Sequence, residues 1–139
     1  MTTFRAMTID DYEAVLALWK ETEGMGLSKA DTRERIAQYL DRNPGLSPLA
    51  FDDSGALIGA ALCGHDGRRG FLHHVAVRAD CRGQGLGRAL VRRCLDGLRA
   101  EGIDRCHLFV ISSNQGGRAF WLSTGWFERT DLTLMSIDV

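Results

Sequence analysis

Residues 81–90, "CRGQGLGRAL", place three glycines within five positions and set an arginine on either side of them. Glycine loses more backbone freedom on folding than any other residue, so this stretch costs stability unless the chain needs bare backbone there. A strand-type run, "FLHHVAV" (residues 71–77), precedes it, and apolar residues at helical spacing follow it up to Gly102. The pattern predicts a strand, a glycine-rich turn and a helix that begins near Gly85.

The turn has the features of an anion site. The first N–H groups of a helix have no intrahelical partner, and the helix dipole is positive at that end. Glycine at 83, 85 and 87 lets an oxygen atom approach several N–H groups, and Arg82 and Arg88 add charge suited to phosphate. Neither the Lys-Ser/Thr pair of a P-loop nor the third glycine of a dinucleotide fingerprint is present. The residues therefore predict a phosphate-containing ligand of another kind.

Composition is that of a globular protein, with 139 residues, 45% of them hydrophobic and 25% charged. We expect a single domain over residues 1–139. No apolar run is long enough for a membrane helix, no export signal begins the chain, and four separated cysteines offer no metal or disulfide motif, so we expect a cytoplasmic protein with reduced thiols. Residues 1–60 hold six basic and ten acidic side chains, whereas residues 66–105 hold nine arginines and five acids. Because the net charge is −1, nucleic acid is not an expected partner.

The remaining periodicities predict an alternation of strands and helices. The expected elements, in order, are a strand at 2–8, helices at 9–22 and 31–40, a hairpin at 49–64, a strand at 71–77, a helix at 85–102, a strand at 105–111, a short helix within 112–125, and one or two strands within 126–139. Adjacent antiparallel strands followed by a β-α-β crossover predict a mixed sheet.

The segment from Arg82 to Gly87 resembles the Arg/Gln-x-x-Gly-x-Gly/Ala signature of the GNAT acetyltransferase superfamily. "HHVAV" before it, "GRALV" after it and "NQGGRAFWLSTGW" (residues 114–126) resemble the flanking segments of small stand-alone bacterial members, of the YpeA type. The resemblance covers essentially the whole chain. It implies an α/β (α+β) fold: a mixed, mostly antiparallel sheet of six or seven strands, flanked by about four helices and splayed open between the strands ending near Val77 and Ile111.

The resemblance also implies a function and a ligand. It implies an N-acetyltransferase that moves an acetyl group from acetyl-CoA to a primary amine by direct attack in a ternary complex, without a metal. The acceptor is expected to be a small molecule, an amino acid or a peptide, and the protein a monomer or homodimer. The coenzyme pyrophosphate is expected on the N–H groups of residues 83–88, and the pantetheine arm beside the strand ending at Val77. The implied coenzyme-binding residues are Val75, Ala76, Val77, Arg82, Gly83, Gln84, Gly85, Leu86, Gly87, Arg88, Asn114, Phe120 and Trp121.

Two departures from the family pattern affect the chemistry. Trp121 stands where a tyrosine often protonates the leaving thiolate, and Phe71 stands where some members carry a glutamate base. His73 and His74 are the main candidate bases, with His65 and Asp66 as others. Strand alternation predicts that His73 and His74 face opposite sides of the sheet, so at most one faces the cleft.

Two alternatives to acetyl transfer remain. The same scaffold can use another acyl-CoA donor. The two departures also leave room for a coenzyme A-binding regulatory module without turnover.

Overall fold

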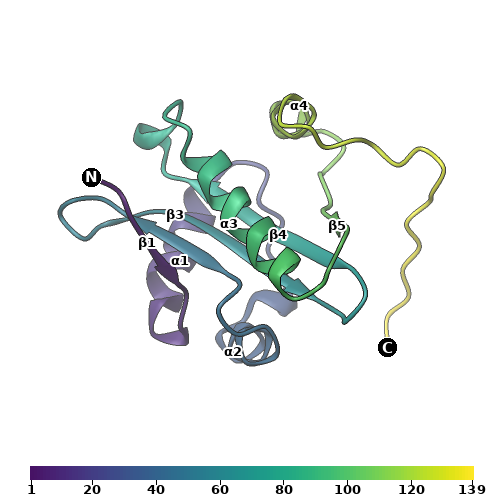
Figure 1. Cartoon of the computed structure of the whole chain (residues 1–139), viewed down its shortest axis with the longest axis horizontal. Helices are drawn as coiled ribbons and strands as arrows, with labels where there is room; N and C mark the ends of the chain where they lie inside the picture. The colour runs from purple at the N-terminus through teal and green to yellow at the C-terminus, as the bar shows by residue number, and fades with distance from the viewer. The chain divides into compact units, whose positions relative to one another are not determined.

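The structure is a computed structural model that describes all residues, 1–139, and it divides into two compact units, Met1–Phe109 and Val110–Val139. The first unit contains a five-stranded sheet in which sequence order is also spatial order (Figure 1). Its strands are β1 (Thr3–Ala6), β2 (Pro48–Phe51), β3 (Leu57–His65), β4 (Gly70–Val77) and β5 (Cys106–His107). Neighbouring strands are antiparallel except β4 and β5, which are parallel. The expected class, a mixed and mostly antiparallel α+β fold, is confirmed.

The four expected α-helices are present. They are α1 (Tyr12–Glu21), α2 (Arg33–Arg42), α3 (Leu86–Ala100) and, in the second unit, α4 (Gln115–Ser123). Three 3-10 turns, η1 (Ile9–Asp11), η2 (Lys29–Asp31) and η3 (Ala79–Cys81), precede α1, α2 and α3 respectively. None of these helices combines the length and the apolar character needed to cross a membrane.

The two faces of the sheet are covered by different helices. Val15 and Trp19 of α1 pack with Ala60 of β3 in one buried cluster. On the other face, a Cβ on Gly59 would lie 2.9 Å from the Leu90 side chain of α3. Because Gly59 and Ala60 are neighbours in one strand, their side chains point to opposite faces, so α1 and α3 sandwich β3. Figure 1 shows α3 crossing in front of β3 and β4, with α1 behind them.

The expected strand count was wrong. The sheet has five strands rather than six or seven, β5 is much shorter than the expected 105–111, and residues 126–139 form no strand. The alternating apolar pattern of "WFERTDLTLMSIDV" was the signal for strands there. A strand needs a partner for its N–H and C=O groups, and the second unit contains no strand that could pair with it.

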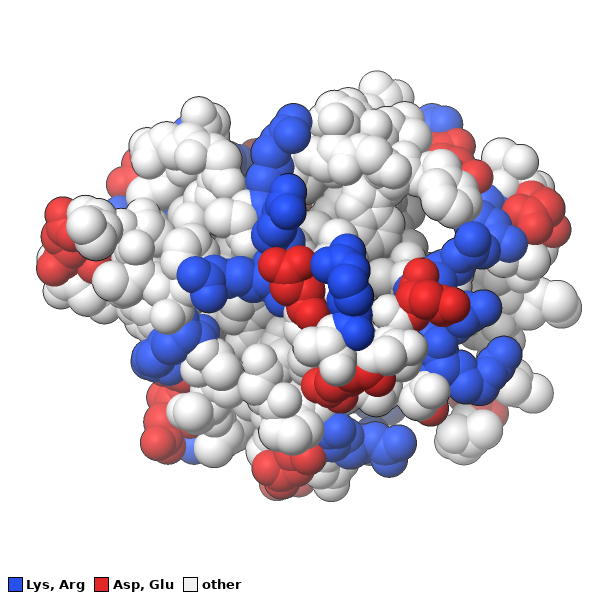
Figure 2. Space-filling view, viewed as in Figure 1, with Lys and Arg blue, Asp and Glu red and all other residues white.

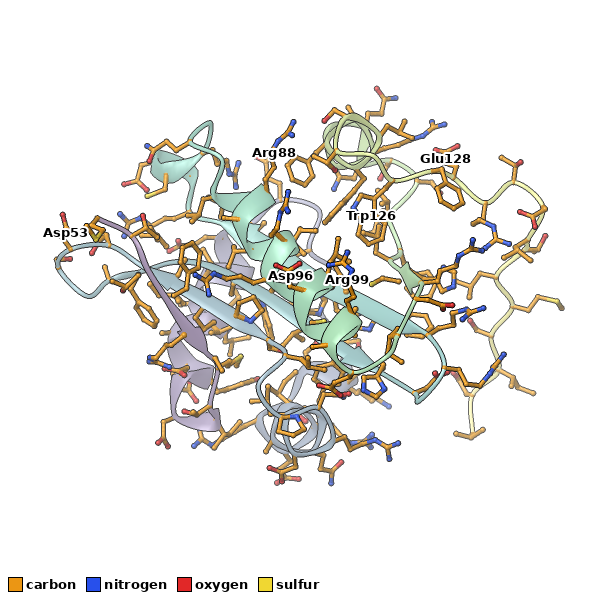
Figure 3. The ribbon with its side chains drawn as sticks, in the orientation of Figure 1. Asp53, Arg88, Asp96, Arg99, Trp126 and Glu128 are labelled. Atoms are coloured by element: carbon orange, nitrogen blue, oxygen red, sulfur yellow. The ribbon has the colours of Figure 1, made fainter.

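The outer side of α3 carries charges of both signs. Figure 2 shows basic side chains over this helix interrupted by acidic ones. Arg99 Nη1 donates to Asp96 Oδ1 at 2.9 Å, one turn apart on the exposed side, as Figure 3 shows. The helix therefore offers no continuous basic stripe for a nucleic acid.

We predict that Leu90→Ala lowers the free energy of unfolding by about 2–5 kcal/mol, since Leu90 is fully buried between α3 and the sheet and its loss leaves a cavity. Urea denaturation measures the change. Arg92→Ala, on the exposed side of the same helix, is the control and should change stability by less than about 0.5 kcal/mol. A Leu90→Ala cost below about 1 kcal/mol would contradict this packing.

Candidate functional site

The glycine turn between β4 and α3 is built from left-handed backbone. Gly83 and Gly85 have φ values of +78° and +79°, which L-residues with a side chain rarely adopt. A Cβ at either position would meet no atom within 4 Å, so the space around both glycines is open. The glycines are therefore needed for the path of the backbone, and they leave that backbone accessible.

The N-terminal end of α3 is uncapped. Gly85 is the N-cap residue and no side chain accepts a hydrogen bond from the first turn. Gly85 C=O accepts from Ala89 N–H, but the N–H groups of residues 83–88 have no acceptor within the protein. Unpartnered N–H groups at the positive end of a fifteen-residue helix attract an anion.

The two arginines beside the turn differ in their contacts. Arg82 Nε donates to Val77 C=O at 3.1 Å, which holds the arginine against the end of β4 and leaves its terminal NH₂ groups for another acceptor. Arg88 is exposed in the first turn of α3, and Figure 3 shows its side chain pointing away from the sheet. Arg78 is instead engaged by carboxylates, with Nε donating to Asp80 Oδ1 at 2.7 Å.

One edge of β4 is unpaired over most of its length. Its pairing with β5 consists of Gly70 with Cys106 and Phe71 with His107, and it stops there. Residues 73–77 therefore present their outward N–H and C=O groups to no neighbouring strand. This stretch includes the predicted coenzyme-binding residues Val75, Ala76 and Val77, and it leads into the glycine turn. An extended ligand with amide groups can pair with such an edge.

A β-bulge lies in the middle of β4. Ala76 pairs with Ala60 and His73 pairs with Leu62, so three residue steps on β4 match two on β3. His74, the one non-glycine residue with a positive φ, has φ +51°. One extra residue is therefore accommodated at His74, in a left-handed conformation.

The bulge overturns the expectation that the two histidines face opposite sides. His74 contacts Trp19 of α1 at a ring-centroid distance of 4.9 Å, and His73 contacts Tyr39 of α2 at 6.2 Å. The two imidazoles also contact each other at 6.4 Å. Strict alternation fails because the extra residue rotates the chain, and both rings lie on the side covered by α1 and α2.

His74 is held by a carboxylate. Its Nε2 lies 2.8 Å from Asp31 Oδ1, and both side chains are largely buried, 15% and 10% exposed. Asp31 Oδ2 also accepts from Ser28 N–H at 2.9 Å, and Asp31 C=O accepts from the Tyr12 hydroxyl at 2.6 Å. Sequence reasoning missed Asp31, because its only local signal is a capping box with Ser28 and nothing marks a partner 43 residues away.

His73 is available as a base. Burial, together with the neighbouring His74, lowers the pKa of His73 below its usual value, because both disfavour the imidazolium. No hydrogen bond engages its ring, and neither ring nitrogen is a buried atom without a partner, so both reach solvent. The neutral imidazole is therefore favoured, and its ring nitrogens are free to accept a proton.

The two other candidate bases have structural roles. His65 Nδ1 accepts from Gly67 N–H at 2.9 Å, and its Nε2 lies 2.7 Å from Glu101 Oε1. Asp66 Oδ1 accepts from the N–H groups of Arg68 and Arg69, which closes the turn between β3 and β4 and lowers the pKa of Asp66. The structure brings no three His, Cys, Asp or Glu side chains into a group that could hold a metal ion.

The remaining predicted residues belong to the second unit. Asn114 caps α4, with its Oδ1 accepting from Gly117 N–H at 3.0 Å. Trp121 packs edge-on against Phe120 at 5.0 Å and against Trp126 at 5.2 Å. These contacts make Asn114 a helix cap and Trp121 the centre of a small aromatic cluster within its own unit.

Comparison with known proteins identifies the relatives of this chain. Residues 12–126 match the model of the acetyltransferase (GNAT) family. An acetyltransferase of Pectobacterium atrosepticum is 33% identical over 105 residues, which cover 76% of this chain and 73% of that protein. The ribosomal-protein-S18-alanine N-acetyltransferase of Escherichia coli superposes with a TM-score of 0.76 at 25% identity, over 94% of this chain and 80% of that one.

A second similar structure contains a ligand. The PaiA N-acetyltransferase of Thermoplasma acidophilum, solved in complex with coenzyme A, superposes with a TM-score of 0.75 at 21% identity. The match covers 90% of this chain and 89% of that one.

We predict that the His74–Asp31 contact couples β4 energetically to the η2 segment. Asp31→Ala, His74→Asn (asparagine tolerates a positive φ) and the double variant form a cycle whose coupling free energy, from urea denaturation, should be about 1–3 kcal/mol. The control cycle pairs Asp31→Ala with the distant Arg92→Ala and should be additive. Additivity in both cycles would mean that the His74–Asp31 contact contributes no coupling free energy.

Proposed function

Because this chain belongs to the acetyltransferase (GNAT) family, we propose that it transfers an acetyl group from acetyl-CoA to a primary amine. The family assignment by itself supports an acetyltransferase with a coenzyme A-type cosubstrate. We further propose that the two units together form one GNAT domain, since the family match runs across their boundary.

The glycine turn is the proposed seat of the coenzyme pyrophosphate. Unpartnered N–H groups, open space at Gly83 and Gly85, and the positive end of α3 fit an anion with several oxygen atoms. Arg82 and Arg88 would supply full charges, Arg82 from a position fixed by Val77 C=O. The main support for the proposal is that this turn directly adjoins the free edge of β4.

The free edge of β4 is the proposed track of the pantetheine arm. Pantetheine has two amide groups, which would pair with the backbone of Val75 and Val77 as an added strand does. This places the thioester further along β4, toward the bulge and the histidines. Asn114, Phe120 and Trp121 remain proposed contacts from the second unit.

The proposed reaction is direct attack by the neutral amine on the thioester carbonyl. A C–N bond forms, the C–S bond breaks, coenzyme A leaves as the thiolate, and the amine proton passes to a base. A lysine-type amine must first lose a proton at a cost of roughly 4–5 kcal/mol at pH 7, whereas an α-amine costs about 1 kcal/mol. A base close to the amine is therefore most needed for strongly basic acceptors.

His73 is the proposed base. Its nitrogens reach solvent, its lowered pKa favours the neutral form, and no hydrogen bond holds it elsewhere. His74 is engaged by Asp31 and is instead proposed to fix the bulge. The thiolate needs no acid in place of Trp121, since departure of a thiol of pKa about 8.5 as its anion costs roughly 2 kcal/mol at pH 7.

The direct test is release of free coenzyme A from acetyl-CoA, followed with a thiol-reactive dye over a panel of primary amines. We expect turnover with at least one amine, and mass spectrometry should identify an N-acetyl product. Tight coenzyme binding with no product across the panel would favour a regulatory module without turnover.

We predict that Gly87→Glu weakens coenzyme A binding by at least about a hundredfold, because it sets a carboxylate beside the pyrophosphate. Isothermal titration calorimetry measures the affinity. Gly87→Ala is the matched control: alanine suits the first turn of α3, adds no charge, and should bind coenzyme A as the parent does. Equal affinity in the folded glutamate variant would place the pyrophosphate elsewhere.

A second prediction concerns pH. Since the His73 pKa is lowered, the base form dominates at neutral pH, and the acidic limb of kcat/KM that His73 contributes should lie below pH 6.5, separate from the rise that follows the fraction of neutral amine. His73→Asn should remove this acidic limb and lower kcat. His65→Asn, in a histidine tied to Glu101, should keep the limb. If the acidic limb survives in His73→Asn, a group other than His73 is the base.

A further inference from the structure

Three rings form a surface that the coenzyme site does not account for. Phe71 and His73 of β4 and Phe109, just beyond β5, lie at mutual centroid distances of 6.3–6.4 Å. Their planes are within 9–30° of one another, so they present roughly parallel faces. We call these three residues the aromatic shelf. His107 adjoins it, 5.7 Å from Phe71.

The sheet register brings the shelf together. Phe71 pairs with His107 across β4 and β5, and His73 and Phe109 each lie two residues further along their chains. Alternation gives Phe71, His73 and His107 the same face, and the ring contacts place Phe109 beside them. Tyr39 of α2 supports His73 edge-on from one side. Phe109, by contrast, is 59% exposed. An exposed ring that continues a stacked set is an available binding surface for another flat apolar group.

The rings of the shelf themselves carry no fixed charge. No arginine or lysine lies over Phe71 or Phe109, since the cation–π contacts of the protein are on Phe4 and Phe51. The lowered pKa of His73 favours its neutral form, and Asp31 is already engaged by His74. Burial raises the pKa of the Tyr39 hydroxyl well above its usual value, so it too is neutral. A carboxylate or second ammonium on a ligand would find no ionic partner among these rings.

We propose that the aromatic shelf binds an aromatic group of the acceptor, so that the preferred acceptor is a primary amine carried by a short linker on an aromatic ring. This rests on the proposed function, because it places the amine at His73. With the nitrogen there, Phe71 and Phe109 are the adjoining surfaces for the rest of the molecule. Stacking on them replaces the ionic contacts that would select an amino acid or polyamine.

The test compares two primary amines of similar basicity, 2-phenylethylamine and ethanolamine, by kcat/KM for coenzyme A release. The parent should prefer 2-phenylethylamine by about tenfold or more. Phe109→Ala should reduce that preference about three- to tenfold while leaving kcat/KM for ethanolamine within about twofold. Phe4→Ala removes a phenylalanine ring on β1, distant from the shelf in the sheet order, and should leave the preference intact.

Equal kcat/KM values for the two amines, or an equal loss for both in Phe109→Ala, would overturn the shelf assignment and leave the transferase standing. If neither amine is acetylated, calorimetry with 2-phenylethylamine in the presence of desulfo-CoA tests binding to the shelf independently of turnover. Binding that Phe109→Ala weakens would support the shelf although turnover had failed. No detectable binding to the parent would overturn it.

Discussion

Strand β4 is hydrogen-bonded to β3 along its length but to β5 only near its start, around Gly70 and Phe71, so the outward-facing N–H and C=O groups of residues 73–77 must find another partner. An unpaired edge of this kind is a liability that proteins cover or use. Here it runs directly into a turn whose N–H groups also lack acceptors. The two features match the two halves of coenzyme A. The strand edge matches its amide groups, and the turn at the start of α3 matches its phosphates. The proposed coenzyme site depends on this continuity.

The bulge in the same strand has a cost that nearby contacts offset. A histidine at φ +51° is strained by roughly 1–3 kcal/mol, and it persists only where its surroundings fix it. The Asp31 carboxylate and the Trp19 ring do so for His74. The extra residue also turns His73 and His74 to the same side. We propose that His74 is thus a structural anchor and that His73 is left to accept a proton.

Local patterns in the sequence predicted the local parts of this structure. Glycines at 83 and 85, with a helical stripe after them, were enough for the strand–turn–helix unit and its uncapped end. Features that need a distant partner were not predictable. The contact between Asp31 and His74 spans 43 residues. The bulge puts His73 and His74 on the same side of the sheet, whereas strand alternation predicts opposite sides. The alternating pattern of residues 126–139 likewise predicted strands, but the second unit offers no strand to pair with them. The roles of the site residues remain proposals.

Amide hydrogen exchange with and without desulfo-CoA tests the continuity of the turn and the strand edge most directly, because it reads the backbone N–H groups themselves. We expect coenzyme binding to slow exchange in two segments, the outward-facing amides within 73–77 and those of 83–88, while the amides of β1 and β2 are unchanged. Saturating binding without protection in either segment would contradict this expectation. Protection of the turn alone would support the proposed pyrophosphate site and contradict the proposed path of the pantetheine arm along β4.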